Sequence, residues 1–361
     1  MLALGQPQPL QPAPRPDQPA AEALASSSAV AASWYQWIAE CLLRNCTVES
    51  MLQTMVAAGM PRAVAATAVQ EMHSDPVFAA AMRMRELRDK QVSVMQNLQR
   101  LWEQAPYYDH VEKRSRVSKD EFLTRYVYSC RPVVLRDLTT DWPAMQRWSP
   151  EDLKARFGHL EVEIQAERSG NQLYEVDKLK HRRQVNLGKF VDRVTSTGVS
   201  NDEYLTANNE LLRRPEFAPL LEDIGSLPDI CDRSRLAESS SFWFGPAGTV
   251  TPLHHDTLML FHTQVVGRKR WRFVSPLENH RVYNNFEVYS PVNLDAVDLH
   301  RYPEFANVKV LDVVVEPGET MFLPLAWWHQ VSSLDVSLSF SYSNLSVPNE
   351  YSFVNPKITN W

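Results

Sequence analysis

Cysteine is scarce in this chain of 361 residues, which has four, at positions 41, 46, 130 and 231. None forms a C-x-x-C pair, so the sequence excludes a small disulfide-stapled domain and a zinc site built on paired thiolates. Such low usage is typical of proteins in a reducing compartment, and we predict a cytoplasmic protein.

Long apolar runs and an excess of positive charge are also missing. No segment reaches the ~20 consecutive apolar residues that cross a bilayer, so we expect no membrane span. The chain has 37 basic and 43 acidic residues and a net charge of −6. Proteins that hold nucleic acid through its phosphates are usually basic, so we expect no nucleic-acid partner.

The first 31 residues lack the pattern of a folded segment. Residues 1–31 contain six prolines, several glutamines and an Ala/Ser tract. They have neither the basic start nor the compact apolar core of a signal peptide. Because such a composition buries little apolar surface, we predict a disordered tail.

A helical pattern follows over residues 32–104. Apolar residues recur with helical spacing, Thr47 and Asp75 stand at N-cap positions, and Pro61 stands in the first turn of a third helix. We predict a separate helical domain here and take it as the candidate surface for a homodimer. Residues 105–116, with one proline and mixed charge, are predicted to be a linker.

Strand patterns dominate the remainder, residues 117–361, which we predict to be one catalytic domain. Short strand-like segments such as those at 131–136 and 160–165 are separated by turn residues. Many short antiparallel strands are typical of a closed β architecture. The predicted fold class is therefore mainly β, a double-stranded β-helix or jelly roll preceded by the N-terminal α-helical domain.

One His-x-Asp pair follows a turn-like Gly-Pro-Ala-Gly run. His254 and Asp256 are two residues apart, and on an extended strand such residues project from one face and can hold one ion. Spacing alone identifies no site, because the pattern recurs at His73–Asp75, His110–Glu112 and His159–Glu161.

The surroundings set this pair apart from the others. Thr251 precedes it by three residues, Lys269 follows His254 by fifteen within an apolar strand, and His329 closes a later strand. Two histidines and one carboxylate hold non-haem Fe(II) on one face and leave positions open. A lysine directed into a barrel needs a counter-charge, which a dicarboxylate co-substrate supplies.

Several segments together carry a family resemblance. They include T-P-L-H-H-D from residue 251, Q-V-V-G-R-K-R from 264 and E-P-G-E-T-M-F-L-P-L-A-W-W-H from 316, and they extend over roughly residues 117–345. The chain resembles the JmjC/cupin-like 2-oxoglutarate oxygenases, most closely those related to the asparaginyl hydroxylase that inhibits hypoxia-inducible factor and its bacterial relatives.

The resemblance implies roles for particular residues. His254, Asp256 and His329 would bind Fe(II), and Lys269 would pair with the distal carboxylate of 2-oxoglutarate. That carboxylate would also meet the hydroxyl groups of Thr251 and Tyr204.

Two positions depart from the asparaginyl hydroxylase pattern. Leu260 stands where that enzyme has an amide, and Ser341 falls where it has an asparagine. We assign Ser341 to the co-substrate site by this alignment. The departures indicate a co-substrate pocket or a substrate that differs from those of that enzyme.

The expected activity is an Fe(II)- and 2-oxoglutarate-dependent dioxygenase that uses O2 and hydroxylates an amino-acid side chain in a protein or peptide, with release of succinate and CO2. Three alternatives remain open. The same site can serve N-methyl-lysine demethylation or the hydroxylation of a small metabolite, and a cupin-like barrel can be a non-catalytic binding module.

Overall fold

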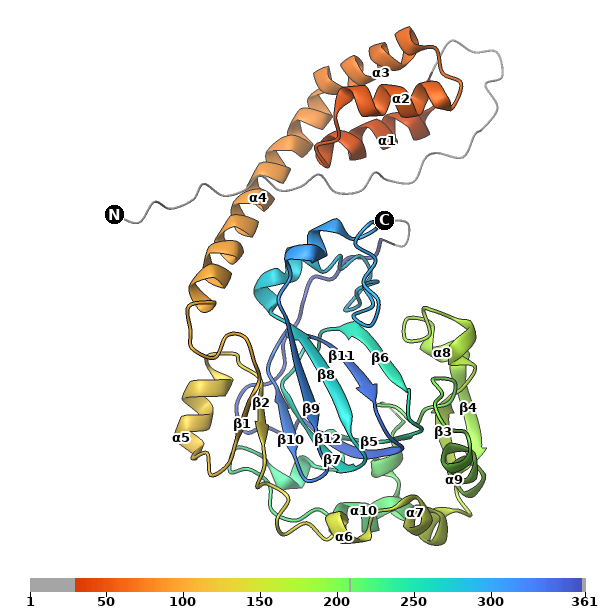
Figure 1. The fold of residues 1–361 in the computed structure, drawn as a ribbon, viewed down its shortest axis with the longest axis vertical. Coiled ribbons are helices and arrows are strands. Elements are labelled where there is room, and N and C mark those ends of the chain that lie inside the picture. The colour runs from red at the N-terminus through yellow and green to blue at the C-terminus, as the bar shows by residue number, and fades with distance from the viewer. Residues whose placement is uncertain (1–29, 208, 359–361) are drawn as a thin grey trace.

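The computed structural model describes residues 30–207 and 209–358. It contains an N-terminal helical bundle and a β-sandwich, joined by one long helix (Figure 1). The disordered tail predicted for residues 1–31 lies outside the described residues except for its last two. Within the described ranges, no helix combines the length and apolarity needed to cross a bilayer.

The helical part begins as the sequence predicts, with caps that satisfy exposed backbone N–H groups. Thr47 Oγ1 accepts a hydrogen bond from Ser50 N at 3.2 Å, and Asp75 Oδ1 accepts one from Val77 N at 2.7 Å. The four helices are α1 (Ala32–Leu43), α2 (Val48–Ala57), α3 (Arg62–Ser74) and α4 (Pro76–Trp102).

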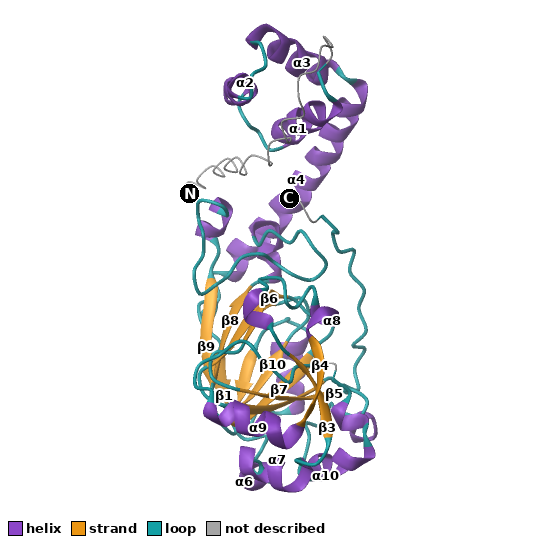
Figure 2. Ribbon diagram, turned by 90° about the vertical axis from the view of Figure 1, so that its right-hand side faces the viewer, coloured by secondary structure: helices purple, strands orange, loops and turns teal. Residues whose placement is uncertain are grey.

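The bundle has its own apolar core, and α4 connects it to the sandwich. Trp37, Met51 and Met55 are buried between α1, α2 and α3. At the far end of α4, the ring of Trp102 packs edge-on against Trp327 with centroids 5.8 Å apart. Figure 2 shows α4 running from the bundle down to the sandwich.

The sandwich consists of two sheets facing each other. The larger has the order β1-β2-β10-β7-β12-β5 and the smaller has the order β6-β11-β8-β9. Neighbouring strands are antiparallel except for the β1–β2 pair. The larger sheet contains β1 (Glu112–Arg114), β2 (Val133–Leu135), β5 (Ser240–Gly245), β7 (Leu260–Val266), β10 (Thr320–Leu323) and β12 (Ser337–Tyr342); the smaller contains β6 (Val250–His254), β8 (Lys269–Val274), β9 (Val310–Val315) and β11 (Trp328–Ser333).

Short helices and a third, two-stranded sheet cover the larger sheet and one edge of the sandwich (Figure 1). Aromatic contacts such as Phe122 with Phe322 and Trp142 with Phe340 join these covers to the larger sheet. The covering elements are α5 (Lys119–Phe122), α6 (Ala144–Arg147), α7 (Pro150–Phe157), β3 (Glu161–Gln165), α8 (Lys178–His181), β4 (Arg182–Asn186), α9 (Leu187–Ser196) and α10 (Ala218–Glu222).

The predicted fold class is confirmed: a mainly β jelly roll follows an N-terminal helical region.

One predicted linker contains more structure than its composition suggested. Within residues 105–116, strand β1 pairs with β2 in parallel. Its Glu112 carboxylate accepts from Arg125 at 2.8 Å and from Arg131 at 3.2 Å. Ion pairs rather than alternating apolar residues hold this strand, so periodicity does not reveal it. The domain boundaries themselves stay predictions.

Candidate active site

The two histidines of the predicted triad lie opposite each other on neighbouring strands. His254 ends β6 and is the register partner of His329 on β11, and the register shifts between His329 and Val331. Asp256 follows in the loop after β6. The antiparallel pairing therefore brings together residues that are 75 positions apart in the sequence.

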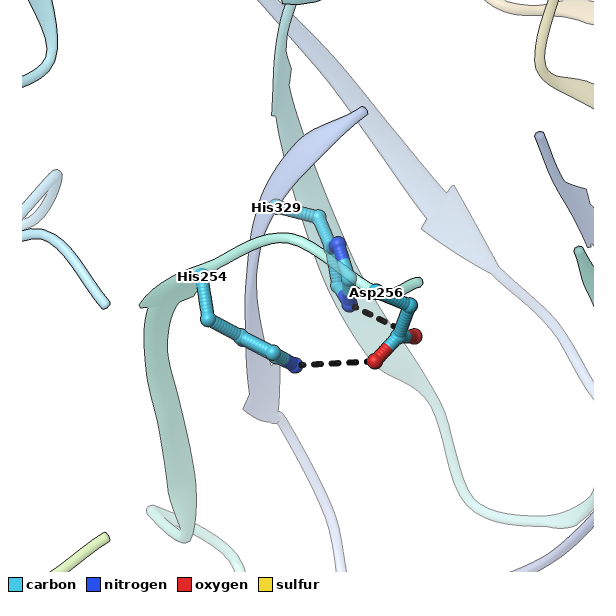
Figure 3. Close-up of side chains that lie close together, drawn as sticks. All are labelled: His254, Asp256 and His329. Atoms are coloured by element: carbon cyan, nitrogen blue, oxygen red, sulfur yellow. Dashed lines mark ion pairs between the residues drawn. The ribbon is translucent and has the colours of Figure 1, made fainter. Parts of the chain in front are cut away.

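The three side chains converge on one point (Figure 3). His254 Nε2 lies 4.0 Å from Asp256 Oδ1, and His329 Nε2 lies 3.8 Å from Asp256 Oδ2. All three candidate ligand atoms lie within 4.8 Å of one another. Ligand atoms that each lie about 2.0–2.2 Å from a metal can adopt such separations around a single ion.

Backbone carbonyl groups fix the tautomer of both rings. His254 Nδ1 donates to Pro252 O at 2.8 Å, and His329 Nδ1 donates to Trp327 O at 2.9 Å. A carbonyl oxygen only accepts, so each Nδ1 carries the proton and each Nε2 presents a lone pair. This second hydrogen bond is the usual device for orienting a metal-binding imidazole.

Burial in the protein favours the neutral forms of Asp256 and His329. Burial raises the pKa of Asp256, an effect that the nearby His254 and His255 oppose, and burial lowers the pKa of His329 well below its usual value. A divalent cation reverses this preference at the carboxyl group because it stabilises the carboxylate directly. The charges of the triad are therefore balanced only when it binds a cation.

A cavity of about 500 Å³ extends from the triad into the sandwich. Its wall includes all three triad residues together with Lys269, Tyr204, Thr251 and Ser341. The cavity lies within the 300–1,000 Å³ range of sites that enclose small ligands. The structure thus brings every sequence-predicted site residue to one cavity.

Lys269 is buried inside this cavity wall and has no carboxylate partner among the described residues. Its Nζ donates to Tyr204 Oη at 3.0 Å and to Ser339 Oγ at 2.8 Å, and it lies 5.4 Å from the centre of the Trp243 ring. Burial lowers the pKa of Lys269 to about 7. An anion in the cavity would restore the charged form.

The other predicted residues occupy distinct positions around the cavity. Thr251 lies on β6 opposite Val331. Ser341 lies on β12, and its Oγ accepts from Trp243 Nε1 at 2.8 Å, so it positions that indole. Leu260 begins β7 and also lines the cavity, where it contributes an apolar surface.

Several buried polar atoms at the wall have no hydrogen-bond partner within the described part of the chain. They include Trp271 Nε1 and His262 Nε2. The Trp271 ring is nearly parallel to His329, with centroids 5.6 Å apart and planes at 19°. An unpaired buried polar atom is unfavourable, so these atoms fit a cavity that is completed by a polar ligand. The donor set, the lone lysine and these atoms together fit a divalent metal with an anionic co-substrate.

Comparison with known sequences agrees with this geometry. The sequence profile of the cupin-like domain matches residues 119–347, which is more than half of the chain. The chain belongs to the cupin-like domain family.

Curated relatives of this cupin-like protein include demethylases. It is 30% identical over 232 residues to lysine-specific demethylase 8 of Xenopus tropicalis, covering 62% of this chain and 50% of the relative. It is 34% identical over 240 residues to lysine-specific demethylase JMJ30 of Arabidopsis thaliana, covering 64% and 54%. Arginine-specific demethylase JMJ20 of the same plant is 26% identical over 265 residues, covering 64% and 56%. The chain spans about half the length of these relatives.

The predicted membership of the JmjC/cupin group is therefore confirmed. The predicted use of Fe(II), 2-oxoglutarate and O2 agrees with this family and with the His–Asp–His group. The special likeness to the asparaginyl hydroxylase stays a prediction, as do the individual residue roles.

Sequence reasoning missed two residues that contact Lys269, namely Ser339 and Trp243. Ser339 accepts from Lys269, and Trp243 lies beside the same ammonium. The alternation S-x-S-x-S around Ser339 was the available signal, because it places Ser339 and Ser341 on one face of β12.

Proposed function

We propose that this protein is an Fe(II)- and 2-oxoglutarate-dependent oxygenase that hydroxylates an amino-acid side chain in a protein or peptide. The observation that carries the proposal is the shared cavity: the His254, Asp256 and His329 group and the buried Lys269 line the same pocket. A metal-only binding module has no need of a buried ammonium beside the metal site.

Different residues of the cavity would bind the metal and the co-substrate. The triad would hold the metal through two imidazole nitrogens and one carboxylate oxygen. Lys269, with the Tyr204 hydroxyl beside it, would receive the distal carboxylate of 2-oxoglutarate. Thr251 lines the same cavity and contributes a further hydroxyl group. Ser341 would act through Trp243, whose indole it orients.

When bound, iron with 2-oxoglutarate and O2 supplies oxidative decarboxylation to succinate and CO2, coupled to the oxidation of a substrate C–H bond. The protein contributes position and the exclusion of water. Trp271 and Phe273 pack against His329 and keep its ring fixed. No side chain has to act as a general base in this scheme.

The cavity exceeds the size of a five-carbon dicarboxylate, so room remains for a substrate side chain. Its wall includes charged residues of both signs, which suit a polypeptide better than a small apolar metabolite. These residues are Glu175, Lys178, Glu210, Arg213 and Glu238.

A second candidate is the removal of an N-methyl group from a lysine in a protein. The names of two relatives, both lysine-specific demethylases, favour this reading. Side-chain hydroxylation and demethylation both begin with hydroxylation of a C–H bond. They differ only afterwards, because a hydroxylated N-methyl group breaks down and releases formaldehyde.

The test is turnover of 2-oxoglutarate by the purified protein with Fe(II) and ascorbate, followed by mass analysis of incubated peptides. Iron-dependent succinate together with a peptide that gains one oxygen atom supports side-chain hydroxylation. Succinate with formaldehyde and loss of a methyl group supports demethylation. A protein that binds neither Fe(II) nor 2-oxoglutarate would be a binding module instead.

A further inference from the structure

The long helix α4 carries a heptad pattern along its exposed face. With Val77 as position a, every a and d position is apolar except Gln91. We call these eight residues the α4 seam. It consists of Val77, Ala80, Met84, Leu87, Gln91, Val94, Leu98 and Leu101, all of them exposed. The large apolar side chains of the α4 seam are between 46% and 76% exposed.

A different face of α4 already packs against the rest of its own chain. Phe78, Val92 and Gln99, each one position after an a residue, are buried. Gln96 Nε2 lies 3.3 Å from His280 Nε2, and Trp102 contacts Trp327. In Figure 1, α1, α2 and the β-sandwich lie to the right of α4. The α4 seam is therefore not the side on which the helix joins its own chain.

The repeat identifies the kind of partner. Apolar residues with a period of 3.5 over four heptads match a left-handed coiled coil, in which each seam residue inserts between four residues of a facing helix. A helix that lies in a membrane surface presents a broader apolar face without a central polar residue. Gln91 interrupts the middle of the α4 seam, so a facing helix is the better match.

We propose that the α4 seam pairs with the α4 seam of a second copy of this chain, forming a parallel two-stranded coiled coil. The other bundle helices of the described chain have 10–13 residues and bury their apolar faces in the bundle core, so they offer no comparable seam. A parallel alignment places Gln91 opposite Gln91 of the partner subunit, where the two amides hydrogen-bond. An antiparallel alignment would place it opposite a leucine. A polar residue at one a position commonly sets orientation in this way.

The charged flanks of the seam give the pairing a distinctive salt dependence. Arg83 and Lys90 occupy g positions and Arg88 occupies an e position, with no acidic residue at either. In the parallel pair Arg83 approaches Arg88 of the partner subunit. Like charges weaken the pair and salt screens them, so the dimer tightens as ionic strength rises. Binding of α4 to an acidic helix or to an anionic membrane would weaken instead.

Light scattering and sedimentation of the full chain test the proposal, with Leu87→Lys/Val94→Lys as the seam variant and Glu86→Lys as its control. Both variants change the net charge by two, and Glu86 is exposed beside the seam. Wild type and E86K are expected to be dimers that tighten with salt. The seam variant is expected to dissociate at least about 100-fold more readily, because it places charges in the contact. A monomeric wild type, or a seam variant that stays dimeric, would overturn the proposal.

Orientation has a separate readout that does not depend on weakening the dimer. Gln91→Cys is expected to form a disulfide-linked dimer under mild oxidation, whereas the wild-type chain under the same conditions is not. Only a parallel, in-register pair brings the two copies of position 91 together. Wild-type dimers in which Gln91→Cys fails to cross-link would refute the parallel arrangement, and a monomer that binds anionic vesicles would assign the seam to a membrane.

Discussion

Lys269 donates a hydrogen bond to Tyr204 at 3.0 Å deep inside the sandwich, and no carboxylate among the described residues neutralises it. Two hydroxyl groups solvate the ammonium, because Ser339 accepts a second hydrogen bond at 2.8 Å. This arrangement leaves a positive charge facing the cavity. The relationship supports Lys269 as the proposed partner of an anionic co-substrate, and several experiments test it.

Lys269→Met should weaken 2-oxoglutarate binding by roughly 10- to 150-fold, because a charge-assisted hydrogen bond is worth about 1.5–3 kcal/mol. Calorimetry or a competition assay measures this directly. Arg270→Met is the matched control, since Arg270 is the next residue on β8 and pairs with exposed Asp312 instead. Equal affinities in wild type and Lys269→Met would remove Lys269 from the co-substrate site.

The affinity for 2-oxoglutarate should fall as pH rises above about 7. The pKa of Lys269 in the empty protein is lowered to about 7 by burial. A bound dicarboxylate favours the ammonium, so binding above this pH takes up a proton, and affinity falls by up to about tenfold per pH unit. Proton uptake at pH 8, measured by calorimetry in buffers of different ionisation enthalpy, is the direct readout. It should vanish in Lys269→Met.

The same lowered pKa should make the ligand-free protein more stable as pH rises, whereas it weakens 2-oxoglutarate binding. The unfolded chain keeps its lysine protonated to about pH 10.5, whereas the folded chain releases the proton near 7. Between these values the unfolded state binds more protons, so this group makes the free energy of unfolding rise with pH. Denaturant unfolding of the metal-free, ligand-free protein should show this slope, and Lys269→Met should flatten it. An unchanged slope would show that Lys269 keeps its proton in the folded protein across this range, so that its pKa is not lowered.

Asp256→Ala should abolish iron-dependent succinate formation and lower iron binding without unfolding the protein. The carboxyl group lies 4.0 Å from His254 Nε2 and 3.8 Å from His329 Nε2, so its loss removes the one anionic ligand. The fold should persist because burial already disfavours this carboxylate when no cation is bound. Asp312→Ala, on the outside of β9, is the control and should keep both properties. Normal turnover in Asp256→Ala would exclude Asp256 from the site.

The fold and the triad could be predicted from the sequence for different reasons. Caps at Thr47 and Asp75 and alternating strands are local signals, and they correctly indicated helices followed by a jelly roll. His254 and Asp256 share their spacing with three other pairs, so the spacing became informative only with the family pattern around it. The contact with His329 depends on strand pairing, which no local signal contains.

Other features depend on three-dimensional context. Ser339 reaches Lys269 from the opposite sheet, so sequence separation hides the contact. β1 is held by ion pairs of Glu112 and shows no apolar alternation. The heptads of α4 are visible in the sequence, but only the exposure of Leu87 and Leu101 separates a docking face from a core stripe.

Substitutions of Trp328, the neighbour of His329 in the chain, should distinguish an effect on stability from an effect on the iron site. Its ring is buried, packs edge-on against His255 with centroids 4.8 Å apart, and donates from Nε1 to Asn279 Oδ1 at 3.2 Å. Trp328→Ala should lower the free energy of unfolding by about 3–5 kcal/mol, because it leaves a large cavity, and Trp328→Phe should lower it less. Denaturant titration measures both.

Iron stoichiometry at saturating metal should stay at the wild-type value in both Trp328 variants. His329 keeps its hydrogen bond to Trp327 O and its contact with Trp271 on the other side of the ring, so its Nε2 remains directed at Asp256. Loss of iron binding without loss of stability would contradict this and would mean that Trp328, rather than Trp271, fixes the imidazole.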